Sequence, residues 1–287
     1  MSSDRAAADG RWRLTARRAL DVAYEARSLI RRERAKLDKL ADELPLRKVL
    51  VLSVYHRGPK YSVPACVELL SSKHDVRLQI GSTSGPPPAP LAEWTSMTHV
   101  TAQRGRFMSL LWENWGERTD GSLPDWLFFL DDDVRLPHRF LDHFLGVVEP
   151  LGFVLANPAQ SRRSHAGWRV TRRHWGCLAR ETRFAEIGPV LAIRREAIEE
   201  LMPILRDRTY DWGVDQHWAW MAERRGWKRG VVDAVPVRHE DSPIGASYSG
   251  DEATRQGQAF LAAHPHIAYD EANATINRHT RLPEPTE

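Results

Sequence analysis

The sequence has 287 residues, 42% of them apolar, and a net charge of +3, so it is long enough for one large α/β domain with a buried core. It contains no run of 18 apolar residues and no apolar stretch near its charged N-terminus, so we expect a cytoplasmic protein without a membrane span or secretory signal. Residues 11–44 hold ten Lys or Arg against six acids and the later residues sum to about zero, so we expect no nucleic-acid partner.

Residues 11–44 are predicted to form one long helix that ends before Pro45. Its apolar residues fall roughly on one stripe, formed by Leu20, Ala23, Tyr24, Ile30, Leu37, Leu40 and Leu44. Two interpretations are open. The helix packs on the body of the protein or on a second copy as a homodimer, or it lies as a peripheral element on anionic lipid at the inner face of the membrane.

After Pro45 the chain alternates apolar strands with helices. Strands are predicted at 48–54, 75–80, 126–130, 153–156 and 231–237, and helices at 63–71, 104–115, 137–148, 196–205 and 215–225. Residues 81–90, GSTSGPPPAP, are predicted to be a loop. Because the strands are continuous apolar runs, we expect a sheet covered on both faces by helices, mixed but mostly parallel. The two cysteines, Cys66 and Cys177, are far apart, which argues against a disulfide or zinc framework.

Three consecutive acids follow the strand predicted at 126–130. Asp131, Asp132 and Asp133 lie at its carboxyl end, where open α/β sheets bind their ligands. Adjacent carboxylates repel one another, so we expect a cation or sugar hydroxyls to offset them. Mg²⁺ or Mn²⁺ fits best, since either ion can bridge carboxylates to a diphosphate. The alternative is an acidic turn that caps the helix beginning near Pro137.

With this turn the sequence resembles the GT-A glycosyltransferases, particularly family 2, over roughly residues 48–248. In that superfamily a strand ends in Asp-X-Asp, which Asp131, Asp132 and Asp133 match. The resemblance implies a Rossmann-like nucleotide-diphospho-sugar transferase fold in which Asp133 ligates the metal and Asp131 holds the ribose or the ion, with Asp132 beside the donor. It divides the chain into a basic helical extension (1–45), a GT-A catalytic domain (46–250), and a C-terminal helix and tail (251–287).

Two further segments match the donor side of that superfamily. Ser53, Tyr55 and Arg57 end the first strand, where family members grip the base and ribose of the nucleotide. Arg104 and Arg106 begin a helix that resembles the Gly-Lys helix of family 2. Their guanidinium groups could contact donor phosphates, or they could simply decorate a helix N-terminus.

The segment YDWGVDQHW, residues 210–218, resembles the family's Trp-Gly-Gly-Glu-Asp-like motif, although Val214 stands where family members have Glu. Gly213 permits a tight backbone, and Trp212 is placed to stack on a sugar. The resemblance implies that Asp215, at a helix start, is the general base of an inverting transfer; its other possible role is the helix N-cap. Glu186 is the second candidate for the working carboxylate, or a ligand of sugar hydroxyls.

His239 follows the last predicted core strand, where many family members supply a metal ligand. Imidazole is a suitable ligand for Mn²⁺, so we predict that His239 completes a metal site with Asp131 and Asp133. The residues around Gly245 that follow are expected to form a mobile lid over the donor.

These matches imply a metal-dependent hexosyltransferase that moves a sugar from a nucleotide-sugar donor to an acceptor hydroxyl. A UDP-sugar is the default donor, and a GDP-sugar remains open. Two alternatives to this interpretation are open. One is a retaining glycosyltransferase on the same fold. The other is a sugar-nucleotide nucleotidyltransferase, which would usually carry a Gly-rich basic loop after its first strand. The sequence leaves the acceptor open.

Overall fold

The computed structural model describes residues 15–27, 33–56, 59–83, 85–98, 103–119, 122–239 and 249–282. The strands are β1 (Lys48–Tyr55), β2 (Asp75–Ser82), β3 (Thr95–Thr98), β4 (Trp126–Asp131), β5 (Val134–Arg135), β6 (Phe153–Gln160), β7 (Ala179–Thr182), β8 (Val190–Arg194), β9 (Lys228–His239) and β10 (Thr275–His279). The helices are α2 (Glu33–Glu43), α3 (Pro59–Leu70), α4 (Leu91–Trp94), α5 (Arg104–Arg118), α6 (Phe140–Val148), α7 (Arg195–Leu201), α8 (Val214–Arg225), α9 (Gly250–Ala263) and α10 (Tyr269–Ala272), with 3-10 turns η1 (Arg169–Thr171) and η2 (Met202–Leu205).

The strands form one sheet in the order β10-β7-β9-β6-β8-β4-β1-β2-β3, with β5 paired to β9 beside this path. Among the strands of this path, β8 and β7 run opposite to β1, and the others run with it. The sheet is therefore mixed and mostly parallel, as predicted.

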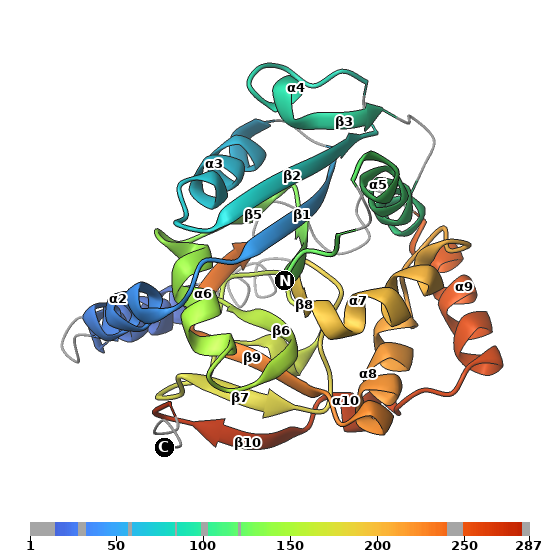
Figure 1. Cartoon of the computed structure of the whole chain (residues 1–287). Helices are drawn as coiled ribbons and strands as arrows, with labels where there is room; N and C mark the ends of the chain where they lie inside the picture. The colour runs from blue at the N-terminus through green and yellow to red at the C-terminus, as the bar shows by residue number, and fades with distance from the viewer. Residues whose placement is uncertain are drawn as a thin grey trace, which may run out of the picture.

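Helices cover both faces of the sheet (Figure 1). Alternate residues of a strand point to opposite faces, so Val51 and Phe128 pack into one core cluster with α2, α3 and α6. Their neighbours Leu52 and Phe129 pack into another cluster with α5, α7 and α8. This two-sided burial explains why β1 and β4 read as continuous apolar runs.

The N-terminal region is helical in two described parts of the range 11–44, and these parts do not establish the predicted single helix. Helix is described at residues 15–27 and in α2, and residues 28–32, which include Ile30, lie outside the described part. The apolar stripe is also placed differently: Tyr24 is buried, but Leu20 and Ala23 are exposed. Asp21 faces the body in their place, because its carboxylate accepts a hydrogen bond from the backbone N–H of Arg162 at 3.0 Å.

Helix α2 packs on α6 through a close backbone contact. A Cβ on Gly146 would lie 3.1 Å from the backbone nitrogen of Ala41, so glycine allows the two helices to approach closely. Leu37 is buried in the same contact region. The described part of the extension therefore packs on the body of the protein, and none of its features supports a membrane contact or a homodimer. No helix among the described residues is both long and apolar enough to cross a membrane.

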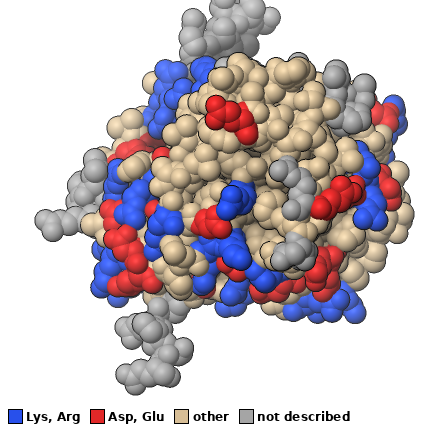
Figure 2. All heavy atoms as spheres, turned by 45° about the horizontal axis from the view of Figure 1, so that its top comes forward, with Lys and Arg blue, Asp and Glu red and all other residues tan. Residues whose placement is uncertain are grey.

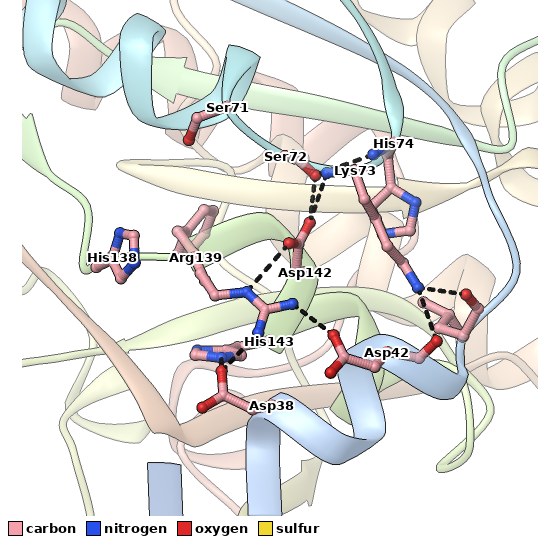
Figure 3. A network of polar contacts seen from close by, with 12 residues as sticks. Asp38, Asp42, Ser71, Ser72, Lys73, His74, His138, Arg139, Asp142 and His143 are labelled. Atoms are coloured by element: carbon pink, nitrogen blue, oxygen red, sulfur yellow. Dashed lines mark hydrogen bonds and ion pairs between the residues drawn. The ribbon is translucent and has the colours of Figure 1, made fainter. Parts of the chain in front are cut away.

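A charge network fixes this helix pair (Figure 3). Arg139, at the N-cap of α6, donates hydrogen bonds to Asp38 and Asp42 of α2, each at 2.7 Å. Its Nε also lies 3.5 Å from the buried carboxylate of Asp142. His143 contacts Asp38 at 2.8 Å, so α2 is joined to α6 by several charged groups rather than by apolar packing alone.

The C-terminal residues add structure that the sequence did not predict. Beyond α9, strand β10 pairs antiparallel with β7 and extends the sheet, where we expected a helix and tail. Both strands are short, and β10 is largely exposed, so neither carries an apolar run. On the face shown in Figure 2, Lys and Arg are interspersed with Asp and Glu.

Candidate active site

The turn between β4 and β5 separates its three acids. Asp132 is buried, and its Oδ2 accepts a hydrogen bond from the backbone N–H of His56 at 2.7 Å. Its carbonyl oxygen accepts a hydrogen bond from Ser62 Oγ at 3.0 Å. Asp132 thus holds the end of β1 and the start of α3 against the turn, while Asp131 and Asp133 have other partners. Its predicted role beside the donor remains a prediction.

The structure brings Asp133 together with His239, two of the residues that we predict as metal ligands. Strand β5 pairs with the end of β9, with Val134 opposite His239, and this register places the imidazole beside the turn. Nε2 of His239 lies 3.0 Å from Oδ1 of Asp133, and both side chains are buried. Burial lowers the pKa of His239, but the Asp133 carboxylate, helped by the Asp131 charge, outweighs it and raises the pKa to about 9.

Arg104, the first residue of α5, joins two acidic segments. Its Nε donates to Oδ1 of Asp131 at 2.6 Å, and its Nη1 forms an ion pair with Asp211. Its Nη2 donates to the carbonyl oxygen of Ile187 at 3.2 Å. Burial lowers the pKa of this guanidinium, and the two carboxylates more than compensate, so the net shift is upward. Gly188 leaves room for the Asp131 carboxylate, because a Cβ on this glycine would lie 3.2 Å from Oδ2 of Asp131.

Sequence reasoning did not identify Asp211 as a member of the site. The signal was present, because Asp211 is the first of two acids that flank Trp-Gly-Val in the motif that drew attention to Asp215. Only the fold shows that this first acid faces Arg104.

Two buried carboxylates complete the site. The side chain of Asn157 accepts a hydrogen bond from the backbone N–H of Glu186 at 2.9 Å and donates one to the carbonyl oxygen of Glu186 at 2.7 Å. Gln160 Nε2 donates to Oε2 of Glu186 at 3.1 Å. Burial, with the negative charge of Asp215, raises the pKa of Glu186 to about 8. Burial, with the charge of Asp211, raises the pKa of Asp215 to about 7. Such shifts are common where carboxylates act as acids or bases.

Asp215 lies in the first turn of α8 and is not its N-cap, which corrects one of the roles that we considered. The N-cap is Gly213, whose φ of 81° lies in the left-handed region that favours glycine. A Cβ on Gly213 would also lie 3.0 Å from Cγ of Leu261 in α9. Trp212 also packs against α9, because a Cβ on Gly257 of that helix would lie 3.1 Å from the Cβ of Trp212. Sugar stacking by Trp212 remains a prediction.

The other predicted donor residues lie in different surroundings. Ser53 and Tyr55 are buried at the carboxyl end of β1, and burial together with Asp132 raises the pKa of the Tyr55 hydroxyl. Arg106 donates to the carbonyl oxygen of Arg206 at 2.7 Å and lies 3.6 Å from Glu113, so these contacts do not join it to the acidic turn. Arg57 and the predicted lid around Gly245 fall outside the described residues.

Within the described ranges, no three His, Cys, Asp or Glu side chains form a group that could hold a metal ion by themselves. Asp133 pairs with His239, and Asp131 pairs with Arg104. A carboxylate and an imidazole side by side are nevertheless ligands that suit Mn²⁺ or Mg²⁺ sites with further oxygen ligands from a substrate.

Two solved glycosyltransferases have a similar fold. One is the mannosyltransferase PcManGT from Pyrobaculum calidifontis in complex with GDP-Man and Mn²⁺, with a TM-score of 0.50 and 14% identity over 91% of this chain and 79% of that chain. The other is GalNAc-T7 with UDP, GalNAc and Mn²⁺, with a TM-score of 0.53 and 13% identity over 77% of this chain and 48% of that chain. This chain thus spans less than half of GalNAc-T7. No protein-family model and no curated protein matches the sequence. The likeness shows a GT-A-like fold, as predicted.

Proposed function

We propose that this protein is a metal-dependent glycosyltransferase that moves a sugar from a nucleotide-sugar donor to an acceptor hydroxyl with inversion. One observation carries the proposal: Asp133 and His239, which are more than a hundred residues apart in the chain, meet at 3.0 Å at the carboxyl end of β4. The charges of Asp131, His239 and Asp215 all act on the pKa of Glu186, which supports a single site that holds the carboxylates and the imidazole. Open α/β sheets bind their ligands at this edge.

The residues present fit a divalent cation. Asp133 and His239 would hold Mn²⁺ or Mg²⁺, with Asp131 beside them, and oxygen atoms of the donor diphosphate would complete the ligand set. When bound, such an ion offsets the negative charge that develops on the departing diphosphate. The two solved structures of similar fold contain Mn²⁺ with GDP-Man or UDP, which supports both the metal and a nucleotide donor.

Asp215 is the better of the two candidate bases. In the proposed reaction the acceptor oxygen forms a bond to the anomeric carbon, the bond from that carbon to the diphosphate breaks, and the acceptor proton passes to Asp215. With a pKa of about 7, Asp215 is largely ionised in mildly alkaline solution, whereas Glu186, at about 8, retains more of its proton. Glu186, anchored by Asn157 and Gln160, suits hydrogen bonding to sugar hydroxyls.

The donor site is tested by thermal unfolding with UDP, GDP and other nucleoside diphosphates, each with and without Mn²⁺. A ligand that binds only the folded state raises the unfolding midpoint, so one nucleotide should stand out and should need the metal. Asp133→Asn should abolish that shift, whereas Asp75→Asn, an exposed carboxylate at the start of β2, should leave it intact. No shift with any nucleotide would remove the proposed donor site.

Inversion is tested on the product. Proton NMR of the anomeric position, compared with that of the donor, should show the opposite configuration. A retained configuration would exclude Asp215 as the base of a direct displacement and would favour the retaining alternative. The nucleotidyltransferase alternative gains no support, since both similar structures are glycosyltransferases.

A further inference from the structure

Three aromatic rings pack together near the candidate base, with Trp168 between buried Phe184 and exposed Tyr269. The Trp168 ring, just before η1, lies 4.3 Å from the ring of Phe184 and 4.8 Å from that of Tyr269, measured between centroids. Phe184 is fully buried, whereas Tyr269 is 64% exposed. None of the motifs that indicate donor binding includes these residues.

Trp168 lies beside the candidate base. Its indole N–H acts as a hydrogen-bond donor toward the carboxylate of Asp215 and lowers the pKa of that group. The same carboxylate accepts a hydrogen bond from the backbone N–H of Gln216 at 2.9 Å. These two donors fix the orientation of the carboxylate at the first turn of α8. Both hydrogen bonds lower the pKa of Asp215, and they act against its burial and the charge of Asp211.

Hydrogen bonds to neighbouring segments hold the rings at this position. Thr171 Oγ1 donates to the carbonyl oxygen of Trp168 at 2.9 Å, and the backbone N–H of Val170 donates to Asn273 Oδ1 at 3.2 Å. Gln216 Nε2 donates to the carbonyl oxygen of Ile267 at 2.9 Å. The segments carrying Trp168 and Tyr269 are therefore both joined to the framework that carries Asp215.

The surroundings of Tyr269 favour a carbohydrate over a lipid chain or an apolar peptide. Arg169, His266 and Asp270 lie near it in sequence or beside its neighbours, and all three are exposed and polar. A single exposed ring among such groups can pack on the C–H face of a sugar while the polar groups meet its hydroxyls. A lipid chain would require a continuous apolar surface.

Building on the proposed function, we propose that Trp168 and Tyr269 form the acceptor side of the site and that the acceptor is a carbohydrate. Trp168 is a positioning residue that orients the Asp215 carboxylate through its indole N–H. Tyr269 stacks on a sugar ring of the acceptor and directs its hydroxyl toward Asp215.

The test measures consumption of the donor identified by thermal unfolding, in the presence of maltose, cellobiose, mannobiose, chitobiose or lactose. At least one disaccharide should accelerate consumption by the wild-type protein. Tyr269→Ala should raise the KM for that sugar about three- to tenfold without changing the KM for the donor, and Tyr269→Trp should restore it. Trp175→Ala is the matched control, since Trp175 is 48% exposed but contacts Tyr24 and Arg27 near the N-terminus.

Trp168→Phe keeps a ring at this position and removes the indole N–H. It should lower kcat and move the acidic limb of the pH profile to higher pH, because the lost hydrogen bond favours the ionised form of Asp215. Both KM values should stay as in the wild type, which a general loss of structure would not produce.

The outcomes separate the two proposals. If the wild-type protein consumes the donor but none of the five sugars accelerates it, or if Tyr269→Ala and Trp175→Ala give equal KM values, the carbohydrate acceptor site is wrong and the donor site stands. An unchanged pH profile and kcat in Trp168→Phe would overturn the positioning role. A protein that neither binds nor consumes any nucleotide sugar would remove the proposed function as well.

Discussion

At the scale of single residues, the site depends on carboxylates that the fold keeps away from water. Glu186 and Asp215 are both about nine-tenths buried. The charge of Asp215 raises the pKa of Glu186, and the charge of Asp211 raises the pKa of Asp215. Placing like charges in a buried site is unfavourable for folding, and it adjusts the proton affinity of the two groups that we propose to act in the reaction.

The rate of glycosyl transfer should rise with pH through the pKa of Asp215. A general base acts in its ionised form, and the pKa of Asp215 is about 7, so kcat should increase from about pH 5 and level off above about pH 8. Asp215→Asn should lower kcat by roughly 10²- to 10⁴-fold. Initial rates across this range provide the measurement, and a flat profile between about pH 6 and 8 would contradict the assignment.

Glu186 should make folding stability depend on pH. Its folded pKa, about 8, exceeds the ordinary value of 4.5, so the folded state binds the proton more tightly than the unfolded chain does. The contribution is fully present below pH 4.5 and is lost as pH rises toward about 8. Relative to the wild type, the free energy of unfolding of Glu186→Gln should therefore rise by up to about 5 kcal/mol between these limits, at about 1.4 kcal/mol per pKa unit.

Denaturant unfolding at several pH values measures this difference. Glu181→Gln, at the one partly exposed position of β7, is the matched control and should track the wild type. If the difference between Glu186→Gln and the wild type does not grow with pH, Glu186 is not the proton-binding group inferred from its burial.

At the scale of elements, helix α8 has a glycine with positive φ at each end, and the two glycines differ in their surroundings. Helix α8 begins after Gly213 and ends before Gly226, and both glycines have positive φ, 81° and 68°. At the N-terminal end a Cβ would also meet Leu261 at 3.0 Å, whereas nothing lies within 4 Å of a Cβ on Gly226. Both glycines therefore adopt a backbone conformation that is unfavourable for other residues, but only at Gly213 would a side chain also meet a close neighbour.

Gly213→Ala should destabilise the protein by about 2–3 kcal/mol and Gly226→Ala by about 1 kcal/mol, because only the former adds a clash to the unfavourable φ. Gly213→Ala should also lower kcat, since it displaces the turn that carries Asp215. Unfolding curves and initial rates of both variants provide the measurement. Equal losses of stability would show that Leu261 moves aside freely.

The docking of α2 offers a second prediction at this scale. Arg139→Asn removes the charge that joins Asp38, Asp42 and Asp142 but tolerates the left-handed backbone at this residue, where φ is 54°. We expect a loss of about 1–2 kcal/mol and faster amide exchange in α2. Lys39→Ala, which removes an exposed pair with Glu43, should change neither, and unchanged exchange in Arg139→Asn would show that apolar packing suffices.

At the scale of the whole molecule, the buried strands of the sheet were predictable and its edges were not. Strands β1 and β4 carry continuous apolar runs, so their positions and the acidic turn after them follow from the sequence. Strands β7 and β10 are short and polar, and they form only because β9 and then β7 offer an edge to pair with. Local patterns do not contain such long-range pairings.

The same limit applies to the site. Asp131, Asp133, Asp215 and His239 each follow or precede a recognisable element, so they could be proposed one at a time. Their partners could not, because the pairing of Arg104 with Asp211 and of Trp168 with Asp215 joins segments 107 and 47 residues apart. The inward face of the helix expected at 11–44 could not be predicted for a related reason, since the body of the protein selects Asp21 and Tyr24 as that face.

The place of β8 in the sheet gives the molecule a modular construction. This strand lies between β4 and β6 and runs antiparallel to both, so it is the seam between a β3-β2-β1-β4 half and a β6-β9-β7-β10 half. Asp131 and the predicted nucleotide-binding residues belong to the first half, and Trp168 and Glu186 lie in loops attached to the second. We therefore expect substitutions on one side of the seam to alter the binding of one proposed substrate more than that of the other, although the proposed metal site, Asp133 with His239, spans both halves.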